Sequence, residues 1–223
     1  PSHKVYENDD FIAFMDVNKR PHSTLLCQVA ADLDDPTNPD KWTIVVWDML
    51  QTWIDAAVHA QDLAGKKFAK MVRRDSDGET YRNIGIIADG KSVSWDPTAS
   101  SHGGDPHGLA QLFGAKGFDM RPPEYTVKGK PCNPNPKDTY LLVKRLLLEK
   151  RLLIHTRSTC EPLRRAFMEQ EDSGDGLTPI KVSGNASDRL SSTIDALRYA
   201  CWAVFHGGPA AAKMISGGGM IVR

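Results

Sequence analysis

The sequence lacks several features that would place it directly in a broad functional class. Its 28 basic and 28 acidic side chains balance, so we expect no overall attraction to nucleic acid, and any DNA contact must come from a local patch. It has no CxxC pair, which argues against a zinc knuckle and favours thiols that serve as small apolar side chains in a reducing compartment. The four cysteines are Cys27, Cys132, Cys160 and Cys201.

Long apolar segments are also missing. The chain has no apolar run of about 18 residues, the length that a membrane-spanning helix requires, and its first residues do not form a signal-peptide pattern. We therefore expect a soluble, intracellular protein. The length of 223 residues suits a single domain, with a core over about residues 11–206 and a mobile tail over about residues 207–223.

Short apolar runs, by contrast, predict a central sheet. Residues 11–16 (FIAFMD) are apolar up to a final aspartate, which is typical of a strand buried on both faces. Residues 23–30 and 42–48 are further strands, and their connections predict an antiparallel meander. Residues 84–89 (IGIIAD) form a fourth strand that ends in a second aspartate, and we expect a crossover connection to lead into it.

Helical spacing takes over after the meander. It predicts an amphipathic helix over residues 49–74, interrupted near Gly65, and the composition of residues 90–117 is typical of an irregular loop. A fifth strand is expected at residues 118–121, with a loop after it. The later expected elements are a helix started by Asn135 and Pro136, a strand at 151–155, a helix from Ser158 to about 169 and a helix over about 188–205.

The last helix places an aspartate beside aromatic residues. Asp195 lies near Tyr199 and Trp202, opposite the stripe that helical spacing assigns to the core. A solvated aspartate on a surface helix is the simpler alternative, but the aromatic neighbours weigh against it. The core stripe consists of Leu190, Ile194, Leu197, Cys201 and Val204.

Three aspartates therefore stand out: Asp16, Asp89 and Asp195. An ionised carboxylate is costly to bury unless it is paired or bound to a cation, so the three together indicate a pair of divalent metal ions. Taken singly, either strand-end aspartate is more simply explained as a residue that starts a turn. An all-oxygen site suits Mg²⁺ or Mn²⁺, whereas zinc would call for cysteine or more histidine.

Longer segments add a family resemblance. MDVNKRPHSTLLCQV, the later strand that ends in aspartate, VKRLLLEKRLLIH and DALRYACW resemble the C-terminal nuclease domain of large terminase subunits, the DNA-packaging motors of tailed bacteriophages. The resemblance implies an α/β, RNase H-like fold with a mixed central β-sheet flanked by α-helices. It also implies a two-metal-ion endonuclease that cuts concatemeric double-stranded viral DNA, with Asp16, Asp89 and Asp195 as catalytic metal ligands and Asp16 bridging the ions.

The chain departs from this family in two respects. Ser191 and Ser192 stand where some relatives have a fourth ligand, and Asp188 is two turns away from Asp195. No GxxxxGK[ST] motif is present, so the ATPase domain of a full-length terminase is absent from this chain. The resemblance implies double-stranded DNA, that ATPase domain, the portal protein and the small terminase subunit as partners, in the host bacterial cytoplasm and without a membrane.

Candidate DNA contacts follow the fifth strand. Arg121, Lys128 and Lys130 suit a DNA-guiding loop, although an ordinary solvated loop explains them equally well. His102 and His107 follow Asp89 in a glycine-rich stretch from which they could approach the metals. Exposed loop histidines are the simpler explanation.

Two other functions fit the same residues. A catalytically idle module that binds DNA or the portal and regulates a partner ATPase would keep the fold, but the presence of all three aspartates favours the enzyme. Another RNase H-like nuclease, such as a resolvase or a ribonuclease H, would use the same chemistry. The DALRYACW ending and the chain length argue against it.

Overall fold

The computed structural model describes most of the chain. The described residues are 11–16, 22–32, 34–35, 38–73, 78, 80–88, 109–121, 126–127, 130–131, 134–169, 174, 185–206 and 221–222. For residues 31, 72–73, 126–127, 130–131, 185–191 and 221–222 the description covers the backbone. Cys132 lies outside these residues, and so does the predicted tail at 207–223 except for residues 221–222.

Three antiparallel strands form the centre of the sheet, which confirms the predicted meander. β1 (Ile12–Asp16) pairs with β2 (His22–Ala31), and β2 pairs with β3 (Thr43–Thr52). Every residue of β1 is buried, as its continuous apolar run predicts for a strand covered on both faces.

Parallel strands extend the meander at both edges. β6 (Gly85–Ala88) runs parallel to β1, and β7 (Asp119–Arg121) runs parallel to β6. On the other edge β10 (Leu152–Ile154) runs parallel to β3, while β11 (Ile221–Val222) pairs with the end of β2. The order is β10-β3-β2-β1-β6-β7, so a crossover leads into the fourth strand as expected, but this strand pairs with β1 and not with the third strand, β3.

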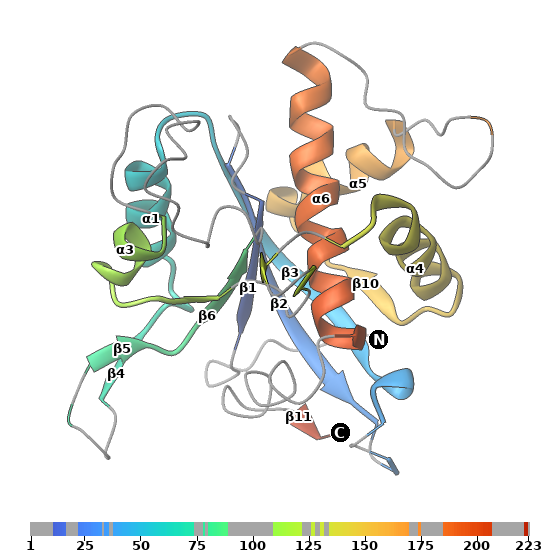
Figure 1. Cartoon of the computed structure of the whole chain (residues 1–223), viewed down its shortest axis with the longest axis horizontal. Helices are drawn as coiled ribbons and strands as arrows, with labels where there is room; N and C mark the ends of the chain where they lie inside the picture. Colours follow the sequence, from blue (N-terminus) through green and yellow to red (C-terminus); the bar gives the residue numbers. More distant parts are fainter. Residues whose placement is uncertain are drawn as a thin grey trace.

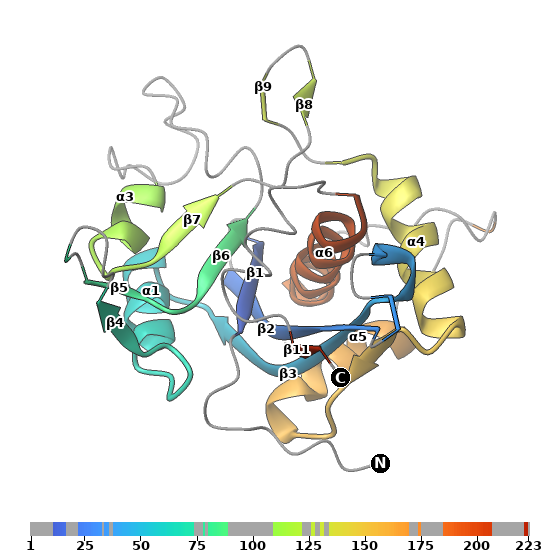
Figure 2. The same ribbon diagram turned by 90° about the horizontal axis from the view of Figure 1, so that it is seen from below.

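Helices cover both faces of this mixed sheet. α1 (Ala56–Ala64) and α3 (Leu109–Gly114) lie on one side. On the other side lie α4 (Pro136–Leu148), α5 (Glu161–Glu169) and α6 (Asn185–His206), with α6 next to the sheet (Figure 1). Figure 2 shows the same arrangement from below, with α6 beside β1 and β2. The chain is thus an α/β protein with three layers.

Each face of the sheet has its own apolar core. Ile12 and Phe14 of β1 belong to the cluster on the α6 side, which also includes Leu197 of α6. Ala13 and Met15 belong to the cluster on the α1–α3 side. Strand alternation therefore assigns each residue of β1 to one of the two layers.

The prediction of a single helix over residues 49–74 is wrong for most of these residues. The first of these residues continue β3, because hydrogen bonding to β2 outweighs the local helical spacing. The Asp55 side chain caps α1, and α1 ends with Gly65 at its C-cap, close to the predicted interruption. The following residues form a separate hairpin of β4 (Met71–Arg73) and β5 (Thr80–Arg82).

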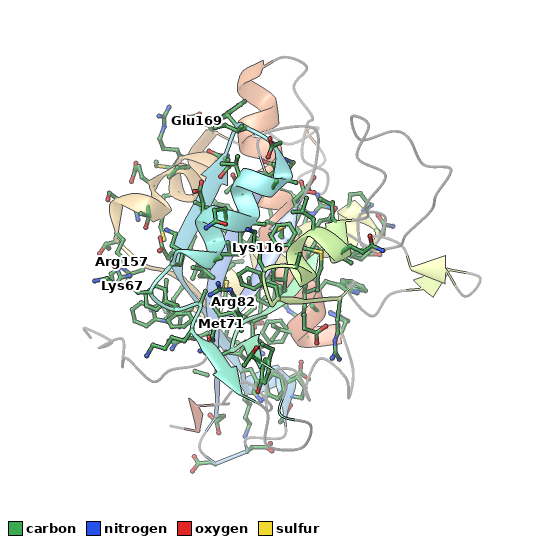
Figure 3. The ribbon with its side chains drawn as sticks, turned by 90° about the vertical axis from the view of Figure 1, so that its left-hand side faces the viewer. Lys67, Met71, Arg82, Lys116, Arg157 and Glu169 are labelled. Carbon is green, nitrogen blue, oxygen red and sulfur yellow. The ribbon has the colours of Figure 1, made fainter. Side chains whose placement is uncertain are left out.

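Arg82 fixes that hairpin to the α1–α3 side of the molecule. Its guanidinium donates to the carbonyl oxygen of Lys116 at 2.8 Å and to that of Ala69, and it lies over the ring of Phe118. Figure 3 views this side and labels Arg82 together with Met71 and Lys116. The hairpin is therefore held by backbone carbonyls rather than by sheet pairing alone.

Two predicted loops contain short elements. α3 lies within the predicted loop at residues 90–117, and a hairpin of β8 (Thr126–Val127) and β9 (Lys130–Pro131) lies within the loop expected after residue 121. A 3-10 turn, η3 (Ser158–Cys160), precedes α5. Such short elements give too few periodic positions for a sequence pattern.

The predicted later helices are confirmed in position, except that α5 begins at Glu161 and not at Ser158, which lies in η3. The Asn135 side chain accepts from the backbone N–H of Lys137 at 3.0 Å and caps α4, with Pro136 at its start. α6 begins at Asn185, three residues before its predicted start at residue 188. No helix in the described part of the chain is long and apolar enough to cross a membrane.

The thiols pack in the core, as expected. Cys27, Cys160 and Cys201 are free and buried, all within the cluster on the α6 side. Burial raises the pKa of the Cys27 thiol well above its ordinary value, with a smaller contribution from Cys201. These residues therefore behave as small apolar side chains.

Candidate functional site

Asp16 ends β1 and is completely buried. Its position continues the alternation of Ile12 and Phe14, so its side chain belongs to the α6 side of the sheet. Ser23 of β2 is its direct cross-strand partner. Side chains of directly opposed residues project from the same face, so Asp16 and Ser23 are neighbours on the α6 side.

Asp89 lies outside the described residues. The position before it, Ala88, ends β6 and pairs with Met15, the residue before Asp16. The described ends of β1 and β6 therefore lie side by side at one edge of the parallel pair. Ligand sites in layered α/β sheets commonly form at such strand ends.

Hydroxyl groups connect this edge to α6. Ser23 Oγ lies 2.9 Å from Ser192 Oγ and 3.5 Å from Thr193 Oγ1. The Gln51 amide donates to Ser23 at 3.3 Å and to Thr193 at 3.4 Å. Because Ser23 is the cross-strand neighbour of Asp16, these contacts hold the start of the buried part of α6 against the end of β1.

Asp195 follows Ser192 by three residues, about one helical turn, and shares its face of α6. It is only 6% exposed, so the solvated alternative is wrong. The Arg198 guanidinium donates to Asp195 Oδ1, and its Nε donates to Thr139 Oγ1 of α4 at 2.8 Å. α6 also packs against β1, β2 and β6, so Asp16 and Asp195 occupy the same side of the sheet.

The donor set suits a hard divalent cation. Carboxylate and hydroxyl oxygens are the ligands that Mg²⁺ and Mn²⁺ prefer, and two carboxylates lie buried on one side of the sheet. Among the described residues, no group of three or more acidic, histidine or cysteine side chains is arranged to hold a metal. Asp89 is not one of those residues, so this finding does not test a site that includes it.

The candidate DNA contacts are only partly described. Arg121 is exposed at the end of β7 and forms an ion pair with Asp119, with Nη2 2.6 Å from Oδ2. Lys128 lies outside the described residues, and Lys130 is described by its backbone in β9. The neighbouring carboxylate of Asp119 partly offsets the positive charge of Arg121, but an exposed ion pair of this kind is weak.

Three other residues were predicted as possible contributors to the metal site, and their side chains are not described. His102 and His107 lie outside the described residues, and Asp188 is described by its backbone in α6. Their part in a metal site stays a prediction.

Sequence reasoning missed the residues that support the carboxylates. Arg198 could have been found, because an arginine three residues after an aspartate in a mostly apolar helix indicates a buried ion pair. Ser192 was weighed only as a missing ligand, whereas it contacts Ser23 across the sheet–helix interface. The partners Ser23 and Thr139 are far from α6 in sequence, so no local pattern reveals them.

A second buried polar cluster lies on the α1–α3 side. His59 of α1 is completely buried, and its Nε2 lies 2.7 Å from Thr24 Oγ1 of β2. Burial, with a smaller contribution from His22, lowers the pKa of His59 from 6.5 to about 3. His59 is therefore neutral near neutral pH and is not a candidate acid or base in that range.

No protein-family model, curated protein or solved structure matches this chain. The geometry defines an α/β protein with a mixed sheet, two helical layers and two buried aspartates, Asp16 and Asp195, on the α6 side.

Proposed function

We propose that this chain is a metal-dependent endonuclease that cleaves double-stranded DNA, with Asp16, Asp89 and Asp195 as its metal ligands. The observation that supports this most directly is the burial of Asp16 and Asp195 on one side of the sheet, on elements that the Ser23–Ser192 contact holds together. Buried carboxylates are retained where they bind a cation or another charged group.

The arrangement of strands supports an RNase H-like fold. An antiparallel meander whose first strand ends in Asp16 is followed by a strand that joins β1 in parallel. Helices cover both faces. This is the mixed sheet that the family resemblance implies, with the ends of β1 and β6 at one edge.

The residues have separable roles in this proposal. Two bound Mg²⁺ or Mn²⁺ ions would polarise the scissile phosphate, supply a hydroxide nucleophile and stabilise the leaving oxygen. Asp16, Asp89 and Asp195 would hold these ions. Ser23 and Gln51 keep α6, and with it Asp195, against the strand end.

The sequence resemblance to large terminase subunits supports a role in packaging a phage genome. The substrate is then concatemeric viral DNA in the host bacterial cytoplasm. The ATPase domain of the full-length polypeptide, the portal protein and the small terminase subunit bring the DNA to the site. A high effective concentration would compensate for a domain without net positive charge.

One observation favours a second function. The Arg198 guanidinium already pairs with Asp195, which is how a purely structural carboxylate would be satisfied. A catalytically idle module that binds DNA or the portal would keep this pair and would not require metal.

A plasmid-nicking assay decides between them. The whole chain should nick supercoiled DNA in Mn²⁺ at least as well as in Mg²⁺, because Mn²⁺ tolerates a less ideal coordination shell, and EDTA should abolish nicking. Asp16→Asn, purified in parallel, serves as the control for contaminating nucleases. Cleavage that persists in EDTA, or no cleavage with either metal, would contradict the enzymatic proposal.

A further inference from the structure

Arg198 occupies an unusual place for a charged side chain. It is 3% exposed, and it lies between Asp195, one turn earlier on α6, and Thr139 on α4. One arm of its guanidinium donates to Asp195 Oδ1, and its Nε donates to Thr139 Oγ1 at 2.8 Å. Two contacts from one planar group fix the orientation of that group.

The contact at Thr139 is itself rigid. Thr139 is completely buried, and its Oγ1 lies 2.9 Å from the carbonyl oxygen of Pro136 and 3.1 Å from that of Asn135. Both carbonyls belong to the capped first turn of α4. The guanidinium is therefore attached at one end to a fixed turn and at the other to the carboxylate of Asp195.

Stability alone is a poor explanation for this arrangement. A buried ion pair is often no more stabilising than apolar residues of the same volume, because both charges must be removed from water. The chain also contains an exposed pair of the same chemistry, in which Arg165 Nη2 lies 2.9 Å from Glu169 Oε1 on α5. The buried pair differs because its acid is a candidate metal ligand.

We propose that Arg198 is a positioning residue that, held by Thr139, orients the Asp195 carboxylate for a divalent cation. This inference rests on the proposed metal site. Arg198 contacts Oδ1, so a cation that binds through Oδ2 leaves the contact in place. Carboxylates that bind metals are commonly oriented by such outer hydrogen bonds, and loss of one typically lowers metal affinity about 10–100-fold.

Positioning and charge have opposite effects on metal affinity, which makes the inference testable. A positive charge near the site repels a cation, so removing the charge alone would raise the affinity. Arg198→Lys keeps the charge but loses the planar fork that joins Asp195 to Thr139. Thr139→Val keeps every charge and removes only the hydroxyl.

The experiment is a calorimetric titration of Mn²⁺ into the whole chain, at a temperature where circular dichroism shows each variant folded. Arg198→Lys should weaken Mn²⁺ binding about 10–100-fold. Arg165→Lys, the same change in the exposed pair, should leave the dissociation constant unchanged. If Arg198→Lys does not fold, the two Thr139 variants decide the question.

Thr139→Val should weaken Mn²⁺ binding in the same direction, and Thr139→Ser, which keeps the hydroxyl, should restore it. A structural role would lower the melting temperature of the Thr139→Val variant without changing Mn²⁺ affinity in the folded protein. The double variant of Arg198→Lys and Thr139→Val should bind Mn²⁺ no more weakly than the weaker-binding single variant, because both substitutions break the same Arg198–Thr139 contact.

The outcomes separate the two proposals. If the wild-type chain binds no Mn²⁺, the proposed function and this inference both fail. If the wild type binds Mn²⁺ but Arg198→Lys and Thr139→Val bind as tightly or more tightly, the metal site stands and the positioning role of Arg198 is wrong.

Discussion

The two sides of the sheet differ in the polar side chains that they bury: one side buries an ion pair and the other a neutral histidine. On the α6 side, Asp195 and Arg198 are buried as an ion pair, with Thr139 contacting the arginine. On the α1–α3 side, His59 stays neutral because burial lowers its pKa to about 3, and its ring nitrogen meets Thr24.

This difference helps to distinguish a functional site from the structural core. A neutral histidine carries no charge that a partner must balance, although the buried Nδ1 of His59 has no hydrogen-bond partner within the described residues. A retained charge pair is costly to bury and gives little net stability, so it is better explained by a use for the carboxylate. The contrast therefore favours the α6 side as the functional one.

The largest expected effect comes from breaking the charge pair. Asp195→Asn should lower the free energy of unfolding by about 3–5 kcal/mol, because it leaves the buried guanidinium of Arg198 without its carboxylate. Glu169→Gln, which breaks the exposed pair with Arg165, should cost less than about 1 kcal/mol. Urea denaturation measures both values, and equal losses would show that the buried pair is not strongly coupled.

On the α1–α3 side, the contribution of His59 to stability should depend on pH. Because the folded pKa of His59 lies below 6.5, the unfolded chain binds more protons, and stability is lost as pH falls from 6.5 toward 3. The contribution of His59 should decrease by about 2 kcal/mol between pH 7 and pH 5.

His59→Gln removes this titration while keeping a polar group near Thr24. Its unfolding free energy should therefore fall less steeply with pH than that of the wild type, as measured by urea denaturation at several pH values. Parallel curves for the two proteins would mean that His59 is protonated in the folded state or does not titrate differently on unfolding.

The smallest expected effect on stability comes from removing one hydrogen bond on the α1–α3 side. Thr24→Val removes the hydroxyl that lies 2.7 Å from His59 Nε2 and should cost about 1–2 kcal/mol, since a buried ring nitrogen loses its partner. Thr80→Val, at an exposed position of β5, is the matched control and should be nearly neutral. A loss as large as that of Asp195→Asn would remove the distinction between the two sides.

Part of this structure could be predicted from sequence. The meander and the presence of a fourth strand after a crossover were predictable, because each strand is a contiguous apolar run bounded by polar residues. The segment at 49–74 was not, because β3 extends by pairing with β2 and a hairpin follows α1. Those interactions are tertiary, and local spacing does not contain them.

In the candidate site, too, local sequence predicts some features and tertiary contacts determine the others. The buried character of Asp195 was favoured by its aromatic neighbours, but the single core stripe expected on the last helix is too narrow. α6 packs against β1, β2, β6, α4 and α5, and residues 192–201 are all buried. The pairing of Asp195 with Arg198 is a short-range signal, whereas the contact with Thr139 depends on how α4 docks.

The central claim is that Asp16 and Asp195 belong to one metal centre. Calorimetric titration of Mn²⁺ into the wild type and Asp16→Asn, with Glu169→Gln as the control, tests it most directly. We expect two Mn²⁺ ions per wild-type chain, an unchanged control, and binding in Asp16→Asn weakened by more than about 100-fold, beyond the effect of an outer partner. Equal Mn²⁺ binding by the wild type and Asp16→Asn would contradict the account.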